Sequence, residues 1–590
     1  MREQQKKQAG FLRRLFFGDV TPNLPKENPF HQQETVISGR RLITRDEAEQ
    51  MADIETTDAG LSFGGVRVGS ETNIIICGQT RSGKTTLLKQ MMAKALLRVK
   101  KGSDERAIIY DATGEFIPFV HAVIGDDAPV IIFDPEDERG VSWDVSADIT
   151  TPAQAQNLTE ILIPKEEGDE PFFIGGAQSV TKAVLESFLL RTAAAREQGE
   201  NFSWTLRDLF NALATKEAAI AVLRSFTGNT IKSFEHEIKL YLERNNNDIL
   251  STIATKSSKA RLVAAMWDER PSISIKDFVE NTDGKVIVIT SSNESSSIVK
   301  ELNRLFIERL AQTLLDTKSL SRKRTHIFLD EFTELGKLDA LKKLLKLGLK
   351  KGVRVYLCYQ NFEEVKEVYG EHQAEVILSE SGTIAFLWQK GKSAAAAAEF
   401  IGKQIVIITN KSTGSSSGEQ GSTMQRTDAE TQVERWTVEP EAFSNRLPLA
   451  GKKNGVAGFF FSPSVRDVWS HRFEWPELER FATAKSDNPA HEPKKPRQGI
   501  AYQFLKTWAN EEQRKFELSH GAKKKDPQQE EHSQTAQAAP VIEQEEQEQS
   551  APVIGAAFNL EEYTGGLKEK FFNRDEFIAS VQRHEQERGN

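Results

Sequence analysis

The sequence predicts an α/β domain with a mostly parallel central sheet, an all-α domain inserted into it, and a disordered acidic C-terminal tail. Strand-sized apolar runs alternate with longer helical patterns from residue 72 to about residue 461. The alternation stops between about residues 145 and 280, where apolar residues recur only at helical spacing. After about residue 489 the composition changes to Gln, Glu, Lys, Ala and Pro. These three observations together predict the arrangement.

Residues 1–60 are expected to form a polar and basic N-terminal segment with one short amphipathic piece, Phe11–Phe17. Arg13 and Arg14 interrupt its apolar residues, so it lacks the continuous apolar stretch of a secretory signal. A basic piece with apolar neighbours can lie on an anionic membrane face. A terminal helix that packs on its own domain, or a disordered terminus, also explains these residues.

The α/β domain is predicted to span residues 61–145 and 281–470. Its expected strands are apolar runs without polar alternation, which is typical of parallel strands covered on both faces. The helical stretches Leu87–Lys100 and Ile298–Lys318 lie between them and would supply that cover. The expected strands are Thr72–Cys77, Ala107–Asp111, Val130–Asp134, Val286–Thr290, His326–Asp330, Val353–Gln360, Thr383–Trp388 and Gln404–Thr409.

The inserted all-α domain is predicted at residues 146–280. Apolar residues recur at helical spacing through Ala177–Leu190, Leu206–Ala214 and His236–Leu250. Further along the chain, residues 409–422 are rich in Ser and Gly, which is typical of a flexible loop.

Residues 471–590 are expected to be a mostly disordered tail. Residues 526–567 contain nine acidic residues and no Lys or Arg, a composition that cannot bury enough apolar surface to fold alone. Five apolar residues then interrupt the charged background of residues 558–588, a pattern typical of a short segment that folds on a partner. Apolar residues without any function would give the same pattern. They are Phe571, Phe572, Phe577, Ile578 and Val581.

Composition and charge limit the class of protein. With 590 residues the chain exceeds one hydrophobic core, and a length of about 150 residues per domain predicts several units. A hydrophobic content of 38%, a charged content of 28%, 38 Gly and 20 Pro together exclude collagen-like, fully disordered and integral-membrane classes. No apolar run approaches the roughly 18 to 20 residues needed to cross a bilayer. Two cysteines cannot form a disulfide framework, so a reducing, cytoplasmic compartment is expected. A net charge of −9 means that any nucleic-acid contact needs a local basic surface.

The clearest motif, Gly78–Thr85, fits G-x-x-x-x-G-K-[ST] and lies between an expected strand and an amphipathic helix. Its glycines let backbone N–H groups and the helix N-terminus surround phosphate oxygens. Lys84 would reach the β and γ phosphates of ATP, and Thr85 would hold Mg²⁺, with Thr86 a weaker candidate. The expected nucleotide-binding residues are Gly78, Gln79, Thr80, Arg81, Ser82, Gly83, Lys84, Thr85 and Thr86.

Two carboxylates, Asp330 and Glu331, close the expected strand that begins at His326. Open α/β sheets bind ligands at this end of their strands. Asp330 is expected to bind the Mg²⁺ hydration shell, and Glu331 to polarise the attacking water as general base. An acid pair after a strand often only caps a helix. Beside a phosphate loop it favours hydrolysis, and a water activator argues against a small-molecule kinase.

Gln360 ends the following expected strand and would lie beside the phosphate loop if that strand is its neighbour. A neutral amide there can donate to the γ phosphate and report its loss. A polar residue that only caps the strand end is the alternative. The expected catalytic residues are therefore Lys84, Asp330, Glu331 and Gln360.

A helical pattern after the acid pair has leucines on one face and lysines on the other. In a ring, the basic face could track nucleic-acid phosphates without reading bases. A solvated helix face explains the same residues equally well. The lysines are Lys342, Lys343, Lys346, Lys350 and Lys351, of which the first three are the expected DNA path.

These residues resemble the type IV secretion coupling proteins, the hexameric DNA-pumping ATPases of bacterial conjugation. The resemblance covers about residues 36–465, and its specific part is the Asp-Glu-Phe-x-x-Leu-Gly-Lys block that begins at Asp330. The other matching segments are the phosphate loop, Gly352–Val355 leading into Gln360, Val368–Gly370 and, more weakly, Gly39–Leu42, Asp111–Phe116 and Pro171–Phe173.

The resemblance implies a RecA-like P-loop ATPase domain and a homo-hexamer that recruits relaxase-bound DNA to a secretion channel and helps to pump it. It implies as partners single-stranded DNA bound without sequence preference, relaxase or adaptor proteins, and a channel or membrane-anchor protein. It implies a cytoplasmic location, peripheral at the inner face of the cell membrane. Two alternatives stay open: an ATPase receptor for protein effectors, and a ring ATPase that handles DNA in defence or chromosome segregation.

The sequence departs from the family pattern at three places. Most members carry N-terminal transmembrane helices and none is recognised here, so a separate membrane partner, or first residues that replace an anchor, is expected. The family's D-x-K-G lysine is Thr113 in this chain. An arginine of the family's G-R-x-x-G pattern is absent from Gly348–Gly352. Lys350, Lys351 and Arg354 are therefore the expected trans-acting basic residues.

Overall fold

The computed structural model describes residues 33–517, except 55–60, 70, 126, 226–233, 245, 282, 291–296, 317–323 and 419–420. Most of the predicted N-terminal segment, and the tail from residue 518 with its apolar residues at 558–588, lie outside the described residues. Within the described part of the chain, no helix is both long enough and apolar enough to cross a membrane.

A ten-stranded sheet forms the centre of the molecule, in the order β2-β17-β16-β13-β5-β12-β11-β6-β10-β7. The seven strands from β13 to β7 are parallel to one another, whereas β16 is antiparallel to both β13 and β17. The predicted mostly parallel sheet is therefore confirmed. The strands are β2 (Leu42–Ile43), β5 (Ile74–Cys77), β6 (Glu105–Asp111), β7 (Val130–Phe133), β10 (Val286–Thr290), β11 (Arg324–Leu329), β12 (Val353–Tyr359), β13 (Thr383–Phe386), β16 (Val456–Phe461) and β17 (Val468–Phe473).

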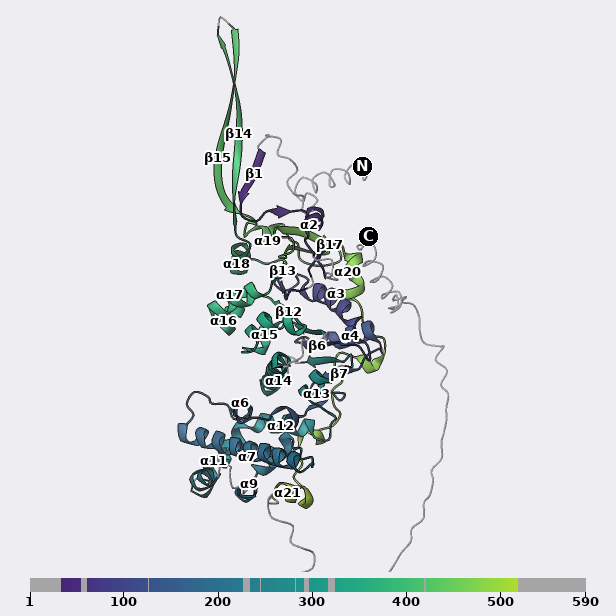
Figure 1. The fold of residues 1–590 in the computed structure, drawn as a ribbon, viewed down its shortest axis with the longest axis vertical. Coiled ribbons are helices and arrows are strands. Elements are labelled where there is room, and N and C mark those ends of the chain that lie inside the picture. Colours follow the sequence, from purple (N-terminus) through teal and green to yellow (C-terminus); the bar gives the residue numbers. More distant parts are fainter. Residues whose placement is uncertain are drawn as a thin grey trace, which may run out of the picture.

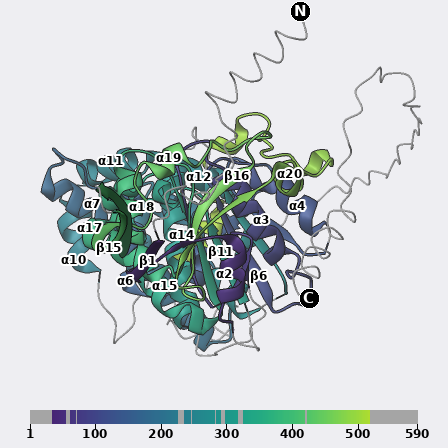
Figure 2. The ribbon, with the colours of Figure 1, turned by 90° about the horizontal axis from the view of Figure 1, so that it is seen from above.

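Helices cover both faces of this sheet, because the central strands are apolar on both sides. On one face, α3 (Lys84–Leu96) and α4 (Phe116–Ile124) pack on the core that contains Ile74 and Ile76. The opposite face is covered by a second group of helices, seen on the other side of the strands in Figure 1 and Figure 2. They are α14 (Ser297–Asp316), α15 (Leu341–Leu347), α16 (Phe362–Tyr369), α17 (Glu371–Glu380) and α18 (Lys392–Ile401).

Residues 145–280 are almost entirely helical and lie below the sheet in Figure 1. The longest helix, α7, spans 27 residues and begins at Pro171, where a missing N–H costs nothing. The segments by which the chain enters and leaves this helical part pair as two short parallel strands, β8 (Ser142–Trp143) and β9 (Ser272–Ile273). The other helices are α5 (Val145–Asp148), α6 (Pro152–Leu162), α8 (Leu206–Ala212), α9 (Lys216–Arg224), α10 (Glu235–Glu237), η1 (Ile238–Glu243), α11 (Asn246–Lys256), α12 (Ser258–Trp267) and α13 (Ile275–Glu280).

The flexible loop expected at residues 409–422 is instead part of a long hairpin. Strands β14 (Lys403–Gly418) and β15 (Gly421–Trp436) pair residue by residue along their whole length. The hairpin projects beyond the rest of the molecule in Figure 1, and β1 (Gln33–Ser38) pairs with the base of β14. Ser- and Gly-rich composition indicated a loop, but an antiparallel ladder satisfies the backbone whatever the side chains are.

Short elements complete the described chain and connect the larger ones. They are α2 (Arg45–Met51), β3 (Leu61–Phe63), β4 (Val66–Val68), η2 (Phe332–Leu335), η3 (Leu349–Lys351), α19 (Ala442–Asn445), α20 (Trp475–Ala482), η4 (Pro489–His491), η5 (Ala501–Gln503) and α21 (Asn510–Glu517).

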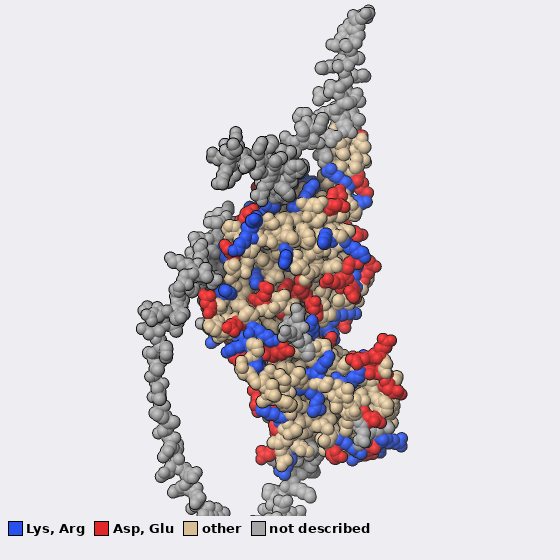
Figure 3. Space-filling view, turned by 180° about the vertical axis from the view of Figure 1, so that it is seen from behind, with Lys and Arg blue, Asp and Glu red and all other residues tan. Residues whose placement is uncertain are grey.

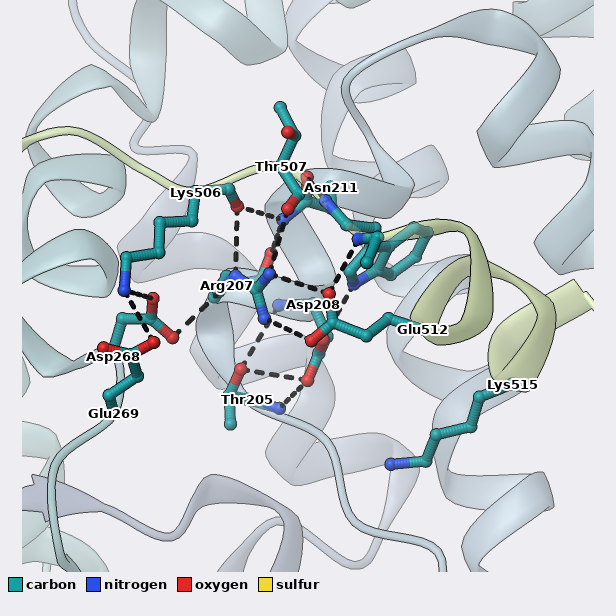
Figure 4. Close-up of polar contacts among 12 residues, drawn as sticks. Thr205, Arg207, Asp208, Asn211, Asp268, Glu269, Lys506, Thr507, Glu512 and Lys515 are labelled. Carbon is teal, nitrogen blue, oxygen red and sulfur yellow. Dashed lines mark hydrogen bonds and ion pairs between the residues drawn. The ribbon is translucent and has the colours of Figure 1, made fainter. Parts of the chain in front are cut away.

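Residues 483–517, here called the C-terminal strap, run from the α/β part of the molecule to the helical residues below it. At the upper end Arg139 donates to the carbonyls of Ala490 and Glu492, at 2.6 and 3.0 Å. At the lower end Arg207 donates to both carboxylate oxygens of Glu512, at 2.9 and 3.0 Å, as Figure 4 shows. The strap therefore holds two parts of the molecule together.

Apolar packing completes the lower attachment. Trp508 donates to Asp208 at 2.8 Å and stacks on Phe516 with ring centroids 4.8 Å apart. Phe516 is 1% exposed and also contacts Phe188 and Phe202. The packed chain thus extends to residue 517, into the span 471–590 that was expected to be mostly disordered. Trp508 and Phe516 are two isolated aromatic residues in a polar stretch, and two residues are too few to give the regular apolar spacing that predicts a packed helix or strand.

Replacing Phe516 by Ala should detach the end of the strap, because truncating a buried Phe costs about 3–5 kcal/mol. Limited trypsin digestion should cut the variant faster between Lys494 and Lys515. Phe504, which is 68% exposed, provides the matched control, and Phe504→Ala should be cut like the wild type. Equal cutting of all three proteins would show that Phe516 does not hold the strap.

Candidate nucleotide site

The predicted phosphate loop connects β5 to α3. Gly78–Gly83 form the loop, and Lys84, Thr85 and Thr86 form the first turn of α3. Gly83 has φ of 98°, and a Cβ there would lie 2.6 Å from Val456. Only glycine fits such a position. Gly83 gives α3 no side-chain cap, so the N–H groups of its first turn face the loop uncapped, as an anion site requires.

The neighbouring strands determine the position of the phosphate loop at the edge of the sheet. β5 lies between β12 and β13. The N–H of Gly78 donates to the carbonyl of Tyr359 at 3.3 Å, and that of Gln79 donates to the carbonyl of Trp388 at 3.0 Å. The loop therefore stands at the carboxyl edge of the sheet, between the ends of two parallel strands, where such sheets bind ligands.

Four residues from three segments of the chain meet there in one connected set of hydrogen bonds and an ion pair. Lys84 Nζ lies 3.2 Å from Glu331 Oε1. Gln360 donates through Nε2 to the same oxygen at 3.0 Å, and Thr80 donates through its hydroxyl to Gln360 Oε1 at 2.8 Å. Glu331 has φ of 49° and ψ of 54°, a left-handed conformation that is uncommon outside glycine and typical of functional sites.

Asp330 lies next to these residues and is 1% exposed. Neither of its carboxylate oxygens has a hydrogen-bond partner. Burial, together with the nearby carboxylates of Glu331 and Asp111, raises the pKa of Asp330 to about 7, against the opposing effect of the charge on Lys84. A buried carboxylate without a partner is an arrangement that a bound cation would satisfy.

The donor set at the loop fits Mg²⁺. Magnesium is usually held by one or two protein oxygens, waters and substrate phosphates rather than by a full protein cage. Asp330 supplies an unpartnered carboxylate, and Thr85 lies at the start of α3 with a hydroxyl. Among the residues the structure describes, no group of three His, Cys, Asp or Glu that could hold a metal occurs.

Asp330→Asn should stabilise the protein in the absence of nucleotide and Mg²⁺, most at alkaline pH. A carboxyl with a raised pKa weakens the folded state progressively as pH rises from about 4 to about 7. A rise from 3.8 to about 7 sets a ceiling of about 4 kcal/mol at pH 8. The thermal midpoint of Asp330→Asn should therefore exceed the wild type by several degrees at pH 8, and by less at pH 5.5.

The control for this measurement is Asp104→Asn, because Asp104 is exposed. Its midpoint should follow the wild type at both pH values. If Asp330→Asn were less stable than the wild type at pH 8, the buried carboxylate would have to be stabilised by a partner within the protein.

Asp111, at the end of β6, holds the backbone of residues 113–116 through hydrogen bonds to its carboxylate. It accepts the backbone N–H groups of Gly114 and Phe116, both at 2.7 Å, and those of Thr113 and Glu115. Burial nevertheless raises the pKa of Asp111. The sequence predicted the strand that ends at Asp111, but not the four backbone hydrogen bonds that Asp111 accepts. It also placed Gln360 beside the phosphate loop, but it did not indicate Thr80, 280 residues away, as the donor to Gln360.

The three basic residues that were expected to act on a nucleotide lie far from the phosphate loop of their own chain. Lys350, Lys351 and Arg354 lie at the start of β12, whereas Gln360 follows its end. Seven strand residues separate the two ends by about 20 Å. These three residues cannot contact a nucleotide on the same loop.

The predicted DNA path lies on α15. Leu341, Leu344 and Leu345 are buried, while Lys343 and Lys346 are exposed and Lys342 is half-buried. Lys346 pairs with Glu380 at 3.3 Å. On the face drawn in Figure 3, basic side chains are interspersed with acidic ones over the upper and lower parts of the molecule. Any nucleic-acid contact on such a surface would depend on local basic residues.

Residues 59–459 match the family model of the type IV secretion-system coupling protein DNA-binding domain. The chain belongs to this family. The coupling protein TraD of Escherichia coli strain K12 is 21% identical over 364 residues, which are 60% of this chain and 48% of TraD. The chain thus spans about half the length of the curated relative that it matches.

Solved structures of the bacterial conjugative coupling protein TrwB share the fold. Its unbound form, TrwBdeltaN70, has a TM-score of 0.55 at 18% identity and covers 79% of this chain and 97% of TrwBdeltaN70. The complex of TrwB with ADP and Mg²⁺ has a TM-score of 0.56 at 17% identity and covers 80% of this chain and 99% of that one. The RecA-like fold class of the coupling family, with its parallel sheet and additional helices, is confirmed.

Proposed function

We propose that this coupling-family chain hydrolyses Mg²⁺-ATP and uses the energy to move DNA into a type IV secretion channel. The observation that supports this most strongly is the contact of Lys84 and Gln360 with one oxygen of Glu331, beside the buried and unpartnered Asp330. Such a site has a group for the phosphates, a group for water and a carboxylate for the metal.

In the proposed reaction, Thr85 and Asp330 hold Mg²⁺, which neutralises charge on the phosphates. Lys84 and the N–H groups of residues 78–86 bind the phosphate oxygens. Glu331 accepts a proton from the attacking water at its carboxylate. Gln360 orients Glu331 through Nε2 and is itself held by the Thr80 hydroxyl. Loss of the γ phosphate would thus alter contacts at the end of β12.

The active form in this proposal is a homo-hexamer with ATP between subunits. Lys350, Lys351 and Arg354 lie about 20 Å from the carboxyl end of their own strand, so the nucleotide that they contact in this proposal is that of a neighbouring subunit. In the ring, Lys342, Lys343 and Lys346 would contact the phosphates of single-stranded DNA without sequence preference.

We further propose that the chain works at the cytoplasmic, inner face of the bacterial membrane. Its relatives TraD and TrwB are named as coupling proteins, and TrwB as conjugative. The expected protein partners are a relaxase or adaptor that brings the DNA, and a channel or membrane-anchor protein that receives it.

Replacing Lys342, Lys343 and Lys346 together by Glu should lower the stimulation of ATPase activity by single-stranded DNA at least fivefold. Basal hydrolysis should change less than twofold, because these lysines lie away from the phosphate loop. The control makes the same charge change at Lys239, Lys259 and Lys276, which are exposed on other helices. Equal loss of basal and stimulated activity would indicate a structural role for the three lysines.

The same assay separates the alternatives. Stimulation by DNA is expected of a DNA motor, whether in conjugation or in another DNA-handling system. An ATPase that responds to a secreted protein and not to DNA would instead act as a receptor for protein effectors.

A further inference from the structure

The proposed site determines the direction in which a bound nucleotide lies across the edge of the sheet. Lys84, Glu331 and Gln360 mark the position of the γ phosphate, and the last two follow the ends of β11 and β12. β12 adjoins β5 on one side of the phosphate loop, and β13 adjoins β5 on the other. A nucleotide with its γ phosphate toward β11 and β12 must therefore extend its ribose and base toward β13 and β16.

Two segments approach the phosphate loop on that side. One follows β13 and contains Trp388, which packs with the core on the face opposite to α3. The other is the 446–455 loop, which leads into β16. Its Ala450 packs against the core cluster that contains Leu87 and Leu88 of α3. Because the phosphates meet the N-terminus of α3, the nucleoside lies on the α3 face, where the 446–455 loop is.

The 446–455 loop is attached directly to the phosphate loop. The N–H of Ala450 donates to the carbonyl of Arg81 at 2.9 Å. At Gly83, a Cβ would lie 3.1 Å from the Cβ of Ala450 and 2.6 Å from Val456. The two loops therefore touch backbone to backbone, within reach of one bound nucleotide.

The loop also holds a fixed shape. The N–H of Gly455 donates to the carbonyl of Gly451 at 2.7 Å, and the Asn454 side chain donates to the carbonyl of Leu449 at 3.0 Å. Gly455 has φ of 62° and leaves no room for a side chain against the backbone of Phe473. A loop fixed in this way can present a side chain to a ligand without a large loss of entropy on binding.

The chemistry of the loop suits a nucleoside. Leu449 is 41% exposed and directly precedes Ala450, whose N–H is bonded to the phosphate loop, so it offers an apolar side chain next to that loop. Lys452 and Lys453, three and four residues after Leu449, are exposed. An aliphatic side chain packs on the face of a base, and ammonium groups suit the phosphate next to the ribose.

We propose that the 446–455 loop is the nucleoside side of the ATP site, with Leu449 as the apolar contact for the base. The inference rests on the proposed function, which gives the nucleotide its direction. An apolar contact packs on the face of a base and does not read its edge. Adenine and guanine nucleotides should therefore bind with similar affinity, and Leu449 should serve both.

The test compares full-length wild type with Leu449→Ala. We expect the Kd for ADP and for GDP, measured by calorimetry with Mg²⁺, to rise about fivefold to tenfold, since much of one leucine contact is lost. The KM for ATP should rise by the same factor, with kcat within twofold. Inorganic tripolyphosphate, which has no nucleoside, should bind both proteins equally. Leu449→Phe should bind ADP like the wild type.

Leu347→Ala is the matched control, because Leu347 is 48% exposed on the opposite face of the sheet. Unchanged ADP binding by Leu449→Ala would overturn the inference, and so would an equal loss of tripolyphosphate binding. A wild type that binds ADP but does not hydrolyse ATP would contradict the proposed function, while the ADP comparison would still decide the role of Leu449. A wild type that binds no ADP would overturn both.

Discussion

Glu331→Gln should hydrolyse ATP about 10³-fold more slowly than the wild type and still bind ATP within about threefold. Glutamine has the shape of glutamate but cannot accept a proton from water. The oxygen that accepts from Gln360 and faces Lys84 is retained as an amide oxygen, so this set of contacts can persist. Steady-state hydrolysis and equilibrium binding of ATP, measured on the same preparation, check both parts of this expectation.

Glu334→Gln is the control for this substitution. Glu334 lies in the same turn, has a side chain that is 56% exposed, and pairs with Lys300 at 3.3 Å. Its replacement should leave turnover within twofold of the wild type. Turnover by Glu331→Gln above a tenth of the wild-type rate would reject Glu331 as the general base.

Lys84→Ala should lose both ATP binding and turnover, each by about 10²-fold or more, because it removes the charge-assisted hydrogen bonds to the phosphates. The two variants thus differ in a diagnostic way: one keeps the nucleotide and the other releases it. Lys94→Ala, ten residues further along α3, tests whether loss of a lysine on this helix alone has any effect. Near-normal affinity of Lys84→Ala for ATP would place the phosphates elsewhere.

The substitution at Lys84 must also be checked for folding. Lys84 is 7% exposed at its side chain and pairs with Glu331. Its removal leaves that carboxylate without its cation, which destabilises a buried pair. Circular dichroism and thermal melting should show a folded protein, and Lys84→Gln offers a longer polar side chain if the alanine variant melts early.

The sequence was sufficient for those parts of the molecule in which local pattern and tertiary role agree. Strands such as Val286–Thr290 are continuous β-branched runs, and burial on both faces is the only environment that suits them. The phosphate loop could also be predicted from the sequence, because its glycines and lysine are close together in the chain and act on the same phosphates. Asp330 and Glu331 were recognised because a strand end positions both with the loop.

The rest depended on contacts that no local pattern encodes. The hairpin of β14 and β15 is stabilised by its backbone ladder, so its Ser- and Gly-rich residues indicated a loop instead. The strap is held by a few residues, such as Trp508 and Phe516, whose partners are some 300 residues away. The attachment of Ala450 to Arg81 likewise joins distant segments, so the 446–455 loop carried no signal of its place beside the nucleotide.

Mg²⁺-dependent ATP hydrolysis by the purified full-length chain, with and without single-stranded DNA and over protein concentrations that span ring assembly, tests the account most directly. The account predicts turnover that requires Mg²⁺, rises with assembly and DNA, and disappears in Glu331→Gln. Wild-type protein that consumes no ATP under any of these conditions, or that consumes it equally well with Gln at position 331, would contradict it.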